Sequence, residues 1–200
     1  MIKNIIFDIG NVLLDFSPAV YFKDIVGADE ICEYIFHSTY WQQHDLGQMS
    51  LSQVKEHLIC ERQEYQLQIE EILSRWTEVL MQKKTVQHIA FLADKGYRIY
   101  LLSNLAKDAT EYVQEKYGFF QEVDGYVVSY KEHCIKPDPK IYQILLERYH
   151  LVPQECIFLD DLKENIHAAK QLGIYGIQVI DEDEALKRLY KMIEEDIHVK

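Results

Sequence analysis

Four short segments of the sequence end in, or carry, polar side chains that could do chemistry together. The segments are IIFD, LLSN, IKPD and FLDD, and their polar side chains are Asp8, Ser103, Asn104, Lys136, Asp160 and Asp161. A carboxylate nucleophile can divide a phosphoryl transfer into two easier steps. Paired carboxylates offer the hard oxygen ligands that Mg²⁺ prefers. A hydroxyl and an amide can donate hydrogen bonds to phosphoryl oxygens, and a lysine adds a positive charge. The set therefore suits metal-assisted phosphoryl transfer.

Each of these side chains also has a purely structural interpretation. An aspartate at the end of a strand can cap the following helix, and Ser-Asn is common in turns. The adjacent acids Asp160 and Asp161 are harder to explain in this way, because two neighbouring carboxylates repel each other unless a cation offsets their charge. The joint occurrence of all four segments favours a functional site.

The segments that precede these residues have the apolar, β-branched character of buried strands. Such runs occur at 3–8, 97–104, 125–129, 155–161 and 174–180, and segments with helical spacing separate them. This alternation predicts a parallel sheet with helices on both faces. Parallel strands bring their carboxyl ends to one edge of the sheet, which is where ligands bind in open sheets of this kind. We therefore expect the polar side chains to share one crevice.

Residues 17–83 contain no comparable strand run. Their apolar residues recur three and four positions apart, which predicts one-sided helices, and Ser50 or Ser52 is the expected N-cap of one of them. The predicted fold is therefore α/β: a Rossmann-like parallel sheet of about five strands, with an inserted helical cap. We assign residues 1–15 and 84–200 to the core domain and residues 16–83 to the cap.

The bulk composition limits the classes of function. The 200 residues carry a net charge of −12, which argues against a nucleic-acid footprint and against an anionic membrane surface. The four cysteines are scattered and read as reduced thiols. No stretch approaches the length of a membrane span, and the sequence MIKNIIFD lacks the apolar region of a signal peptide. We expect a cytoplasmic protein with a small-molecule substrate, and its oligomeric state stays open.

In order and spacing, the four segments resemble the motifs of the haloacid dehalogenase superfamily, in the subfamily with a helical cap inserted after the first motif. FDIGNVL resembles the first motif, LLSN the second, IKPDPKIY the third and FLDDLKEN the fourth. The resemblance covers nearly the whole chain. It implies a Mg²⁺-dependent phosphatase in which Asp8 is the nucleophile that becomes an aspartyl phosphate. Ser103 and Asn104 would bind phosphate, and Lys136 would bridge the nucleophile and the phosphate.

The resemblance also implies a set of metal ligands. Asp8 and Asp161 would bind Mg²⁺ directly, and Asp160 would bind it directly or through water. The family's ligand two residues after the nucleophile is a backbone carbonyl, which Gly10 can supply. Asn165 falls where the family often has a supporting polar residue.

Gly10 is also where the sequence departs from the family pattern, because most phosphatases of the family carry a second aspartate there as general acid. Three interpretations compete. A dehalogenase needs no such acid, but dehalogenases of the family lack the acidic pair found here at 160 and 161. A binding or regulatory module, catalytically impaired, is the alternative function. The interpretation we favour is a working phosphatase, because DIGNV resembles a branch that includes a sugar-1-phosphate phosphatase, so we expect a sugar phosphate such as a hexose 1-phosphate.

Two explanations remain open for how such a phosphatase works. It could favour leaving groups that depart without protonation, or the cap could supply a substitute acid. The segment TYWQQHDLGQMS offers Tyr40, His44 and Asp45, of which His44 is most easily tuned for proton transfer near neutrality. Asp15 is a weaker candidate at the entrance to the cap. A receiver-type signalling domain fits less well, because its acidic pair precedes the phospho-accepting aspartate in the chain.

Overall fold

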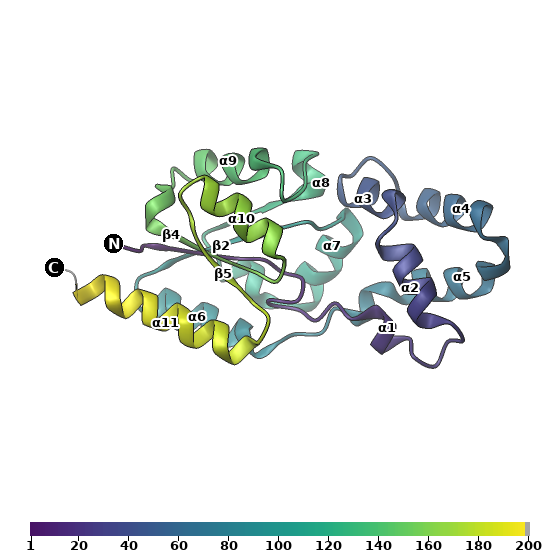
Figure 1. The fold of residues 1–200 in the computed structure, drawn as a ribbon, viewed down its shortest axis with the longest axis horizontal. Coiled ribbons are helices and arrows are strands. Elements are labelled where there is room, and N and C mark those ends of the chain that lie inside the picture. The colour runs from purple at the N-terminus through teal and green to yellow at the C-terminus, as the bar shows by residue number, and fades with distance from the viewer. Residues whose placement is uncertain (199–200) are drawn as a thin grey trace.

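The computed structural model describes residues 1–198, with side chains through residue 195. Its centre is one sheet of five parallel strands in the order β3-β2-β1-β4-β5 (Figure 1). The strands are β1 (Asn4–Phe7), β2 (Arg98–Ser103), β3 (Gly125–Val128), β4 (Cys156–Asp160) and β5 (Tyr175–Gln178). The predicted α/β fold is confirmed. β1 lies in the middle, so the residue that follows it emerges at the centre of the carboxyl edge.

Alternate residues of each strand point to opposite faces of the sheet. On one face, Ile5 and Phe7 pack in the same apolar cluster as residues of α6 (Gln87–Asp94), α7 (Lys107–Lys116) and α11 (Glu182–His198). On the other face, Ile6 packs with residues of α9 (Pro139–Arg148) and α10 (Lys163–Gln171). Both faces are covered, which explains why the strands read as continuous apolar runs. The short helix α8 (Ser129–Glu132) directly follows β3.

The segment between β1 and α6 forms a separate group of helices beside the carboxyl edge of the sheet (Figure 1). Its helices are α1 (Pro18–Tyr21), α2 (Ala28–Phe36), α3 (Thr39–Asp45), α4 (Leu51–Glu61) and α5 (Gln66–Arg75). Ser50 caps α4 in a capping box. Its hydroxyl accepts a hydrogen bond from the Gln53 amide, and the side-chain oxygen of Gln53 accepts one from the Ser50 amide. Among the described residues, no helix is long and apolar enough to cross a bilayer.

The chain enters and leaves the cap through paired extended segments. The Asp15 amide donates to the Met81 carbonyl at 2.7 Å, and the Lys83 amide donates to the Leu13 carbonyl at 2.9 Å. The Lys83 ammonium also lies 3.4 Å from the Asp15 carboxylate. Because both crossings are tied together directly after the first strand, the cap is held over the edge at which that strand ends.

Candidate active site

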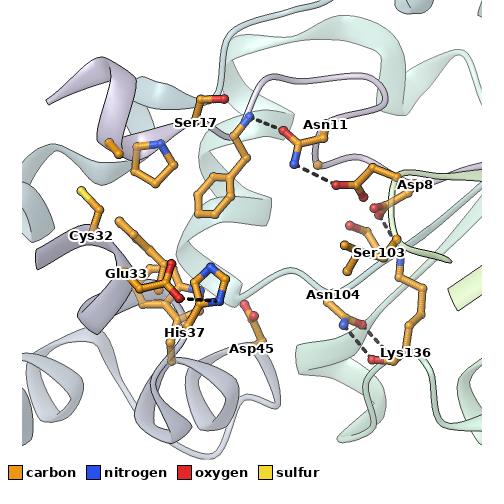
Figure 2. A pocket seen from close by; sticks show the side chains of 18 of the residues that line it. Asp8, Asn11, Ser17, Cys32, Glu33, His37, Asp45, Ser103, Asn104 and Lys136 are labelled. Atoms are coloured by element: carbon orange, nitrogen blue, oxygen red, sulfur yellow. Dashed lines mark hydrogen bonds and ion pairs between the residues drawn. The ribbon is translucent and has the colours of Figure 1, made fainter. Parts of the chain in front are cut away.

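The carboxyl edge of the sheet and the cap enclose a cavity of about 550 Å³. Figure 2 shows the side chains of the sheet edge on one side of this cavity and those of the cap on the other. The predicted site residues in its lining are Asp8, Gly10, Asp45, Ser103, Asn104, Lys136, Asp161 and Asn165. Strand ends that are far apart in the sequence therefore meet in one place, as the parallel topology requires.

Lys136 joins two of the carboxylates at the base of the cavity. Its ammonium lies 2.8 Å from Oδ1 of Asp8 and 2.6 Å from Oδ2 of Asp160. Burial alone would lower the pKa of Lys136, but the charges of Asp160 and Asp8 outweigh it and the pKa is raised. Lys136 thus stays protonated and holds the nucleophile candidate in place.

Asp160 is fully buried and has hydrogen-bond donors on both oxygens. The amide of Asn165 donates to both oxygens at 3.0 and 3.1 Å, and the backbone of Leu162 donates to Oδ1 at 2.8 Å. The ammonium of Lys136 also donates a hydrogen bond to Oδ2. With these partners, the carboxylate of Asp160 is arranged to orient Lys136.

The three carboxylates of Asp8, Asp160 and Asp161 form one cluster, in which one oxygen of each lies within 4.8 Å of the others. Burial raises the pKa of Asp8 to about 7; Lys136 opposes this, and the neighbouring carboxylates add to it. The pKa of Asp161 is also raised, chiefly by burial. One ammonium against three carboxylates leaves excess negative charge in a buried place. A divalent cation with a preference for oxygen ligands fits this donor set.

Asn11 orients Asp161 from the loop after β1. Its amide nitrogen donates to Oδ2 of Asp161 at 2.9 Å, and its amide oxygen accepts from the backbone of Phe16 at 3.0 Å. The backbone of Asn11 has a φ of 55°, a left-handed conformation that asparagine tolerates better than most residues. Sequence reasoning missed Asn11, although an asparagine directly after a glycine in a turn was a usable signal.

Asn104 binds the backbone of Lys136 through both ends of its side-chain amide. The Asn104 side chain donates to the Lys136 carbonyl at 3.0 Å and accepts from the Lys136 amide at 2.7 Å. This reciprocal pair fixes the backbone that carries the lysine. The predicted contact between Asn104 and phosphate stays a prediction, as does that of Ser103, which is buried at the cavity wall.

His44 and Asp45, the two predicted substitute acids, are adjacent at the end of α3 but point to different places. His44 is buried, with Nε2 2.9 Å from Oδ1 of Asp108 on α7 and Nδ1 2.9 Å from the Met49 carbonyl. His44 is not one of the residues that line the cavity, whereas Asp45 is. Geometry thus separates two candidates that the sequence left together.

Ser129 connects the cap to the loop that follows β2. Its hydroxyl donates to the Asp45 carbonyl at 2.6 Å and accepts from the Leu105 amide at 2.9 Å. Sequence reasoning missed both Ser129 and Asp108. Ser129 directly follows a buried strand, the same signal that identified Asp8, but Asp108 is an ordinary position in an amphipathic helix and gave no signal.

The cap side of the cavity is apolar with an acidic rim. The rings of Phe16, Phe36 and Trp41 pack edge to face, with centroids 5.3 and 4.6 Å apart. Asp29 and Glu33 also line this wall, and Glu33 lies 3.5 Å from the ring of His37. A substrate group that enters this side meets aromatic surface and carboxylates.

Comparisons with known proteins agree with the fold. A sequence model described as haloacid dehalogenase-like hydrolase matches residues 2–173. A D-ribitol-5-phosphate phosphatase of Bacteroides thetaiotaomicron is 29% identical over 195 residues, covering 89% of this chain and 92% of the relative. A sesquiterpene phosphatase of Aspergillus oryzae is 25% identical over 180 residues, covering 90% of each.

Solved structures share the same architecture. An enzyme from Bacteroides thetaiotaomicron, crystallised with magnesium and inorganic phosphate, superimposes with a TM-score of 0.72 at 22% identity, covering 89% of this chain and 94% of that one. An L-2-haloacid dehalogenase from Xanthobacter autotrophicus superimposes with a TM-score of 0.69 at 21% identity, covering 94% and 82%. One fold thus serves proteins with different named activities, so the residues of the site must decide the chemistry.

Proposed function

The chain belongs to the haloacid dehalogenase-like hydrolase family, and we propose that it is a Mg²⁺-dependent phosphatase of a small phosphorylated metabolite such as a sugar phosphate. The observation that carries this proposal is the buried arrangement of Asp8 beside Lys136, in a carboxylate cluster with excess negative charge. A dehalogenase has no use for that cluster, whereas a phosphatase needs a cation there to accept a phosphate dianion.

In this proposal Asp8 attacks phosphorus and forms an aspartyl phosphate, which water then hydrolyses. Lys136 holds the attacking carboxylate and offers its charge to the phosphoryl oxygens, and the Ser103 hydroxyl donates a hydrogen bond to them. The carboxylates of Asp8 and Asp161 and the backbone carbonyl of Gly10 would hold the Mg²⁺. When bound, the ion supplies charge neutralisation and alignment for in-line transfer.

The similar proteins support a phosphatase more than another hydrolase. Two relatives that match the chain along about nine-tenths of its length are named as phosphatases, one of a sugar-alcohol phosphate and one of a sesquiterpene. Because these two names differ so widely in the leaving group, the choice of substrate must come from the cap. The resemblance of DIGNV to a sugar-1-phosphate phosphatase branch makes a hexose 1-phosphate our first candidate.

The charges of the cap wall narrow the substrate further. Asp29, Glu33 and Asp45 line that wall, and His37 is already paired with Glu33. A second phosphate or a carboxylate on the leaving group would meet these acids and be repelled. We therefore propose that the substrates are monophosphates whose leaving group carries no further charge. We expect sugar monophosphates to be hydrolysed with higher kcat/KM than the corresponding bisphosphates.

The test is phosphate release from an aryl phosphate and from a panel of sugar and polyol phosphates, with Mg²⁺ and with a chelator. We expect activity only with Mg²⁺, and none in Asp8→Asn. Asp24→Asn is the control, because it removes the same charge from an exposed position of the cap. A protein that binds Mg²⁺ but releases no phosphate from any substrate would overturn the proposal and favour a binding module.

A further inference from the structure

The position of the missing acid is open space in this structure. A Cβ placed on Gly10 would have no atom within 4 Å, and the backbone there is not in the left-handed region. No bulky neighbour has filled the gap, and no strained turn demands the glycine. The space that a side chain at position 10 would occupy is therefore open to the cavity and to groups that line it.

Asp45 is a cap carboxylate that lines the same cavity as Gly10. It is the last residue of α3 and lines the cavity together with Asp8 and Ser103. Figure 2 shows its carboxylate pointing into the space between the cap side chains and Asn104, on the far side of the cavity from Asp8. In-line displacement places the leaving oxygen opposite the attacking one, so a group leaving from phosphorus bonded to Asp8 departs toward the cap.

Contacts across the cap–core interface fix the position of Asp45. We call residues 44–47 the docking turn. Its Asp45 carbonyl accepts from the Ser129 hydroxyl, and the neighbouring Leu46 carbonyl lies 2.9 Å from Nδ1 of His133. Gly47 packs so closely on the core that an added Cβ would lie 2.6 Å from the Tyr130 carbonyl oxygen. The turn is thus seated on the core by its backbone, so the seating does not depend on the Asp45 side chain.

The charges around Asp45 suit a group that alternates between two protonation states. Burial raises its pKa to about 7; His44 opposes this, Asp108 on α7 adds to it, and the Ala106 amide opposes it. The other charged or titratable groups of the cavity wall are Asp8, Asp29, Cys32, Glu33, His37, Lys136 and Asp161. A carboxyl group poised near neutrality can give up a proton and take one back at the working pH.

We infer that Asp45 is the general acid and base of this site, supplied by the cap in place of a side chain at position 10; this inference rests on the proposed phosphatase function. In the first step Asp8 bonds to phosphorus, the bond to the leaving oxygen breaks, and the Asp45 proton moves to that oxygen to give a free alcohol. In the second step water attacks phosphorus, its proton returns to the Asp45 carboxylate, and the bond to Asp8 breaks as phosphate leaves.

The test compares two leaving groups in Asp45→Asn. The aryloxide of an aryl phosphate can leave phosphorus without being protonated. The alkoxide of a sugar phosphate is a poor leaving group, so its oxygen needs a proton from the acid. In single-turnover experiments, which isolate the first step, we expect the rate constant for release of the alkyl alcohol to fall by about 10²–10⁴-fold, the usual worth of general acid–base catalysis. The rate constant for release of the aryl product in the same step should fall far less. In the double variant Gly10→Asp/Asp45→Asn, where the new carboxylate has room, we expect much of the alkyl activity to return.

Asp29→Asn is the matched control, since it removes one charge from the same wall, and we expect it to change both substrates by the same factor. Equal losses of the first-step rate constant for the two substrates in Asp45→Asn would overturn the inference and assign Asp45 to seating the cap. If Asp8→Asn retained activity, the proposed function itself would fail instead. A ¹³C NMR titration of the Asp45 carboxyl needs no substrate: a midpoint near neutrality is expected, and a midpoint in the ordinary aspartate range would contradict the inference.

Discussion

The ammonium of Lys136 lies 2.8 Å from the carboxylate of Asp8, and the two side chains are only 1% and 10% exposed. A buried ion pair of this kind is a weak source of stability by itself, because desolvation offsets most of the attraction. Its value here is positional. The lysine fixes the position of an Asp8 carboxylate oxygen, while Asp160 and the side-chain amide of Asn104 set the position of the lysine itself.

Replacing Lys136 tests this relationship through stability. Lys136→Met keeps an unbranched side chain that is one atom shorter, but it leaves Asp8 and Asp160 buried without their cation. In a chelator at neutral pH, we expect the free energy of unfolding to fall by about 3–5 kcal/mol, as when one partner of a buried pair is removed. Urea unfolding measures it. Lys140→Met on the exposed side of α9 is the control, and equal changes in the two variants would contradict the assignment.

Asn11 should control the affinity for Mg²⁺, since it orients the carboxylate of Asp161. Asn11→Gly preserves the positive φ and removes only the side-chain contacts. We expect the Kd for Mg²⁺ to rise by about 10–100-fold, the usual effect of losing a partner that orients a metal ligand. Isothermal titration calorimetry with the ion alone gives this value, and an unchanged Kd would show that Asp161 needs no such support.

The strand ends of this site were predictable because they follow from short-range patterns. A buried apolar run that stops at a polar residue identified Asp8, Ser103 and Asp160, and the parallel topology then brought them together. The partners of Asn104 were not predictable, because the same residue could turn its amide to a phosphate or to the backbone of Lys136. That choice depends on the path of a loop 32 residues further along the chain.

The pair of His44 and Asp108 should make the seating of the cap depend on pH. Burial alone would lower the pKa of His44, but the contact with Asp108 outweighs this and raises it above its ordinary 6.5; the pKa of Asp108 is lowered below 3.8, against burial. The pair therefore makes its full contribution to the free energy of unfolding between about pH 4 and pH 6.5. Its contribution falls as the pH rises through the pKa of His44 in the folded protein, and also as the pH falls through that of Asp108.

His44→Gln should accordingly lower the free energy of unfolding more at about pH 5.5 than at about pH 9, by roughly 1 kcal/mol, because Asp108 is partly exposed and solvent screens the pair. Chemical denaturation at the two pH values measures the difference. His57→Gln is the control, because His57 is exposed and stacks on the ring of Tyr40. A difference of the same size in His57→Gln would assign the effect to the general charge of the protein.

Gly47 tests whether the docking turn must sit closely on the core. Gly47→Ala combines a φ of 67° with a contact of 2.6 Å to a backbone oxygen that cannot rotate away. Gly96→Ala is a matched control, because its φ is 90° but its Cβ would meet open space. We expect Gly47→Ala to cost about 1–3 kcal/mol more than Gly96→Ala and to reduce turnover, whereas similar results for both variants would assign the effect to backbone strain alone.

The separation of His44 from Asp45 shows where sequence reasoning stops. Both residues lie in the last turn of one helix, and their side-chain chemistry favoured the histidine. Tertiary contacts separate the two residues. His44 pairs with Asp108 and lies outside the cavity lining. The Asp45 carbonyl accepts a hydrogen bond from Ser129, 84 residues further along the chain, and Asp45 lines the cavity. No pattern within the cap encodes these contacts with the core.

The most direct test of the central claim is to trap the phosphorylated enzyme. Protein that is turning over an aryl phosphate with Mg²⁺ is quenched in acid, reduced with borohydride, which converts an aspartyl phosphate into homoserine, and analysed by peptide mass spectrometry. We predict homoserine at position 8, absent when a chelator is present and enriched in Asp45→Asn. Release of phosphate with no modification at position 8, or with the modification on another aspartate, would contradict the assignment of Asp8 as the nucleophile.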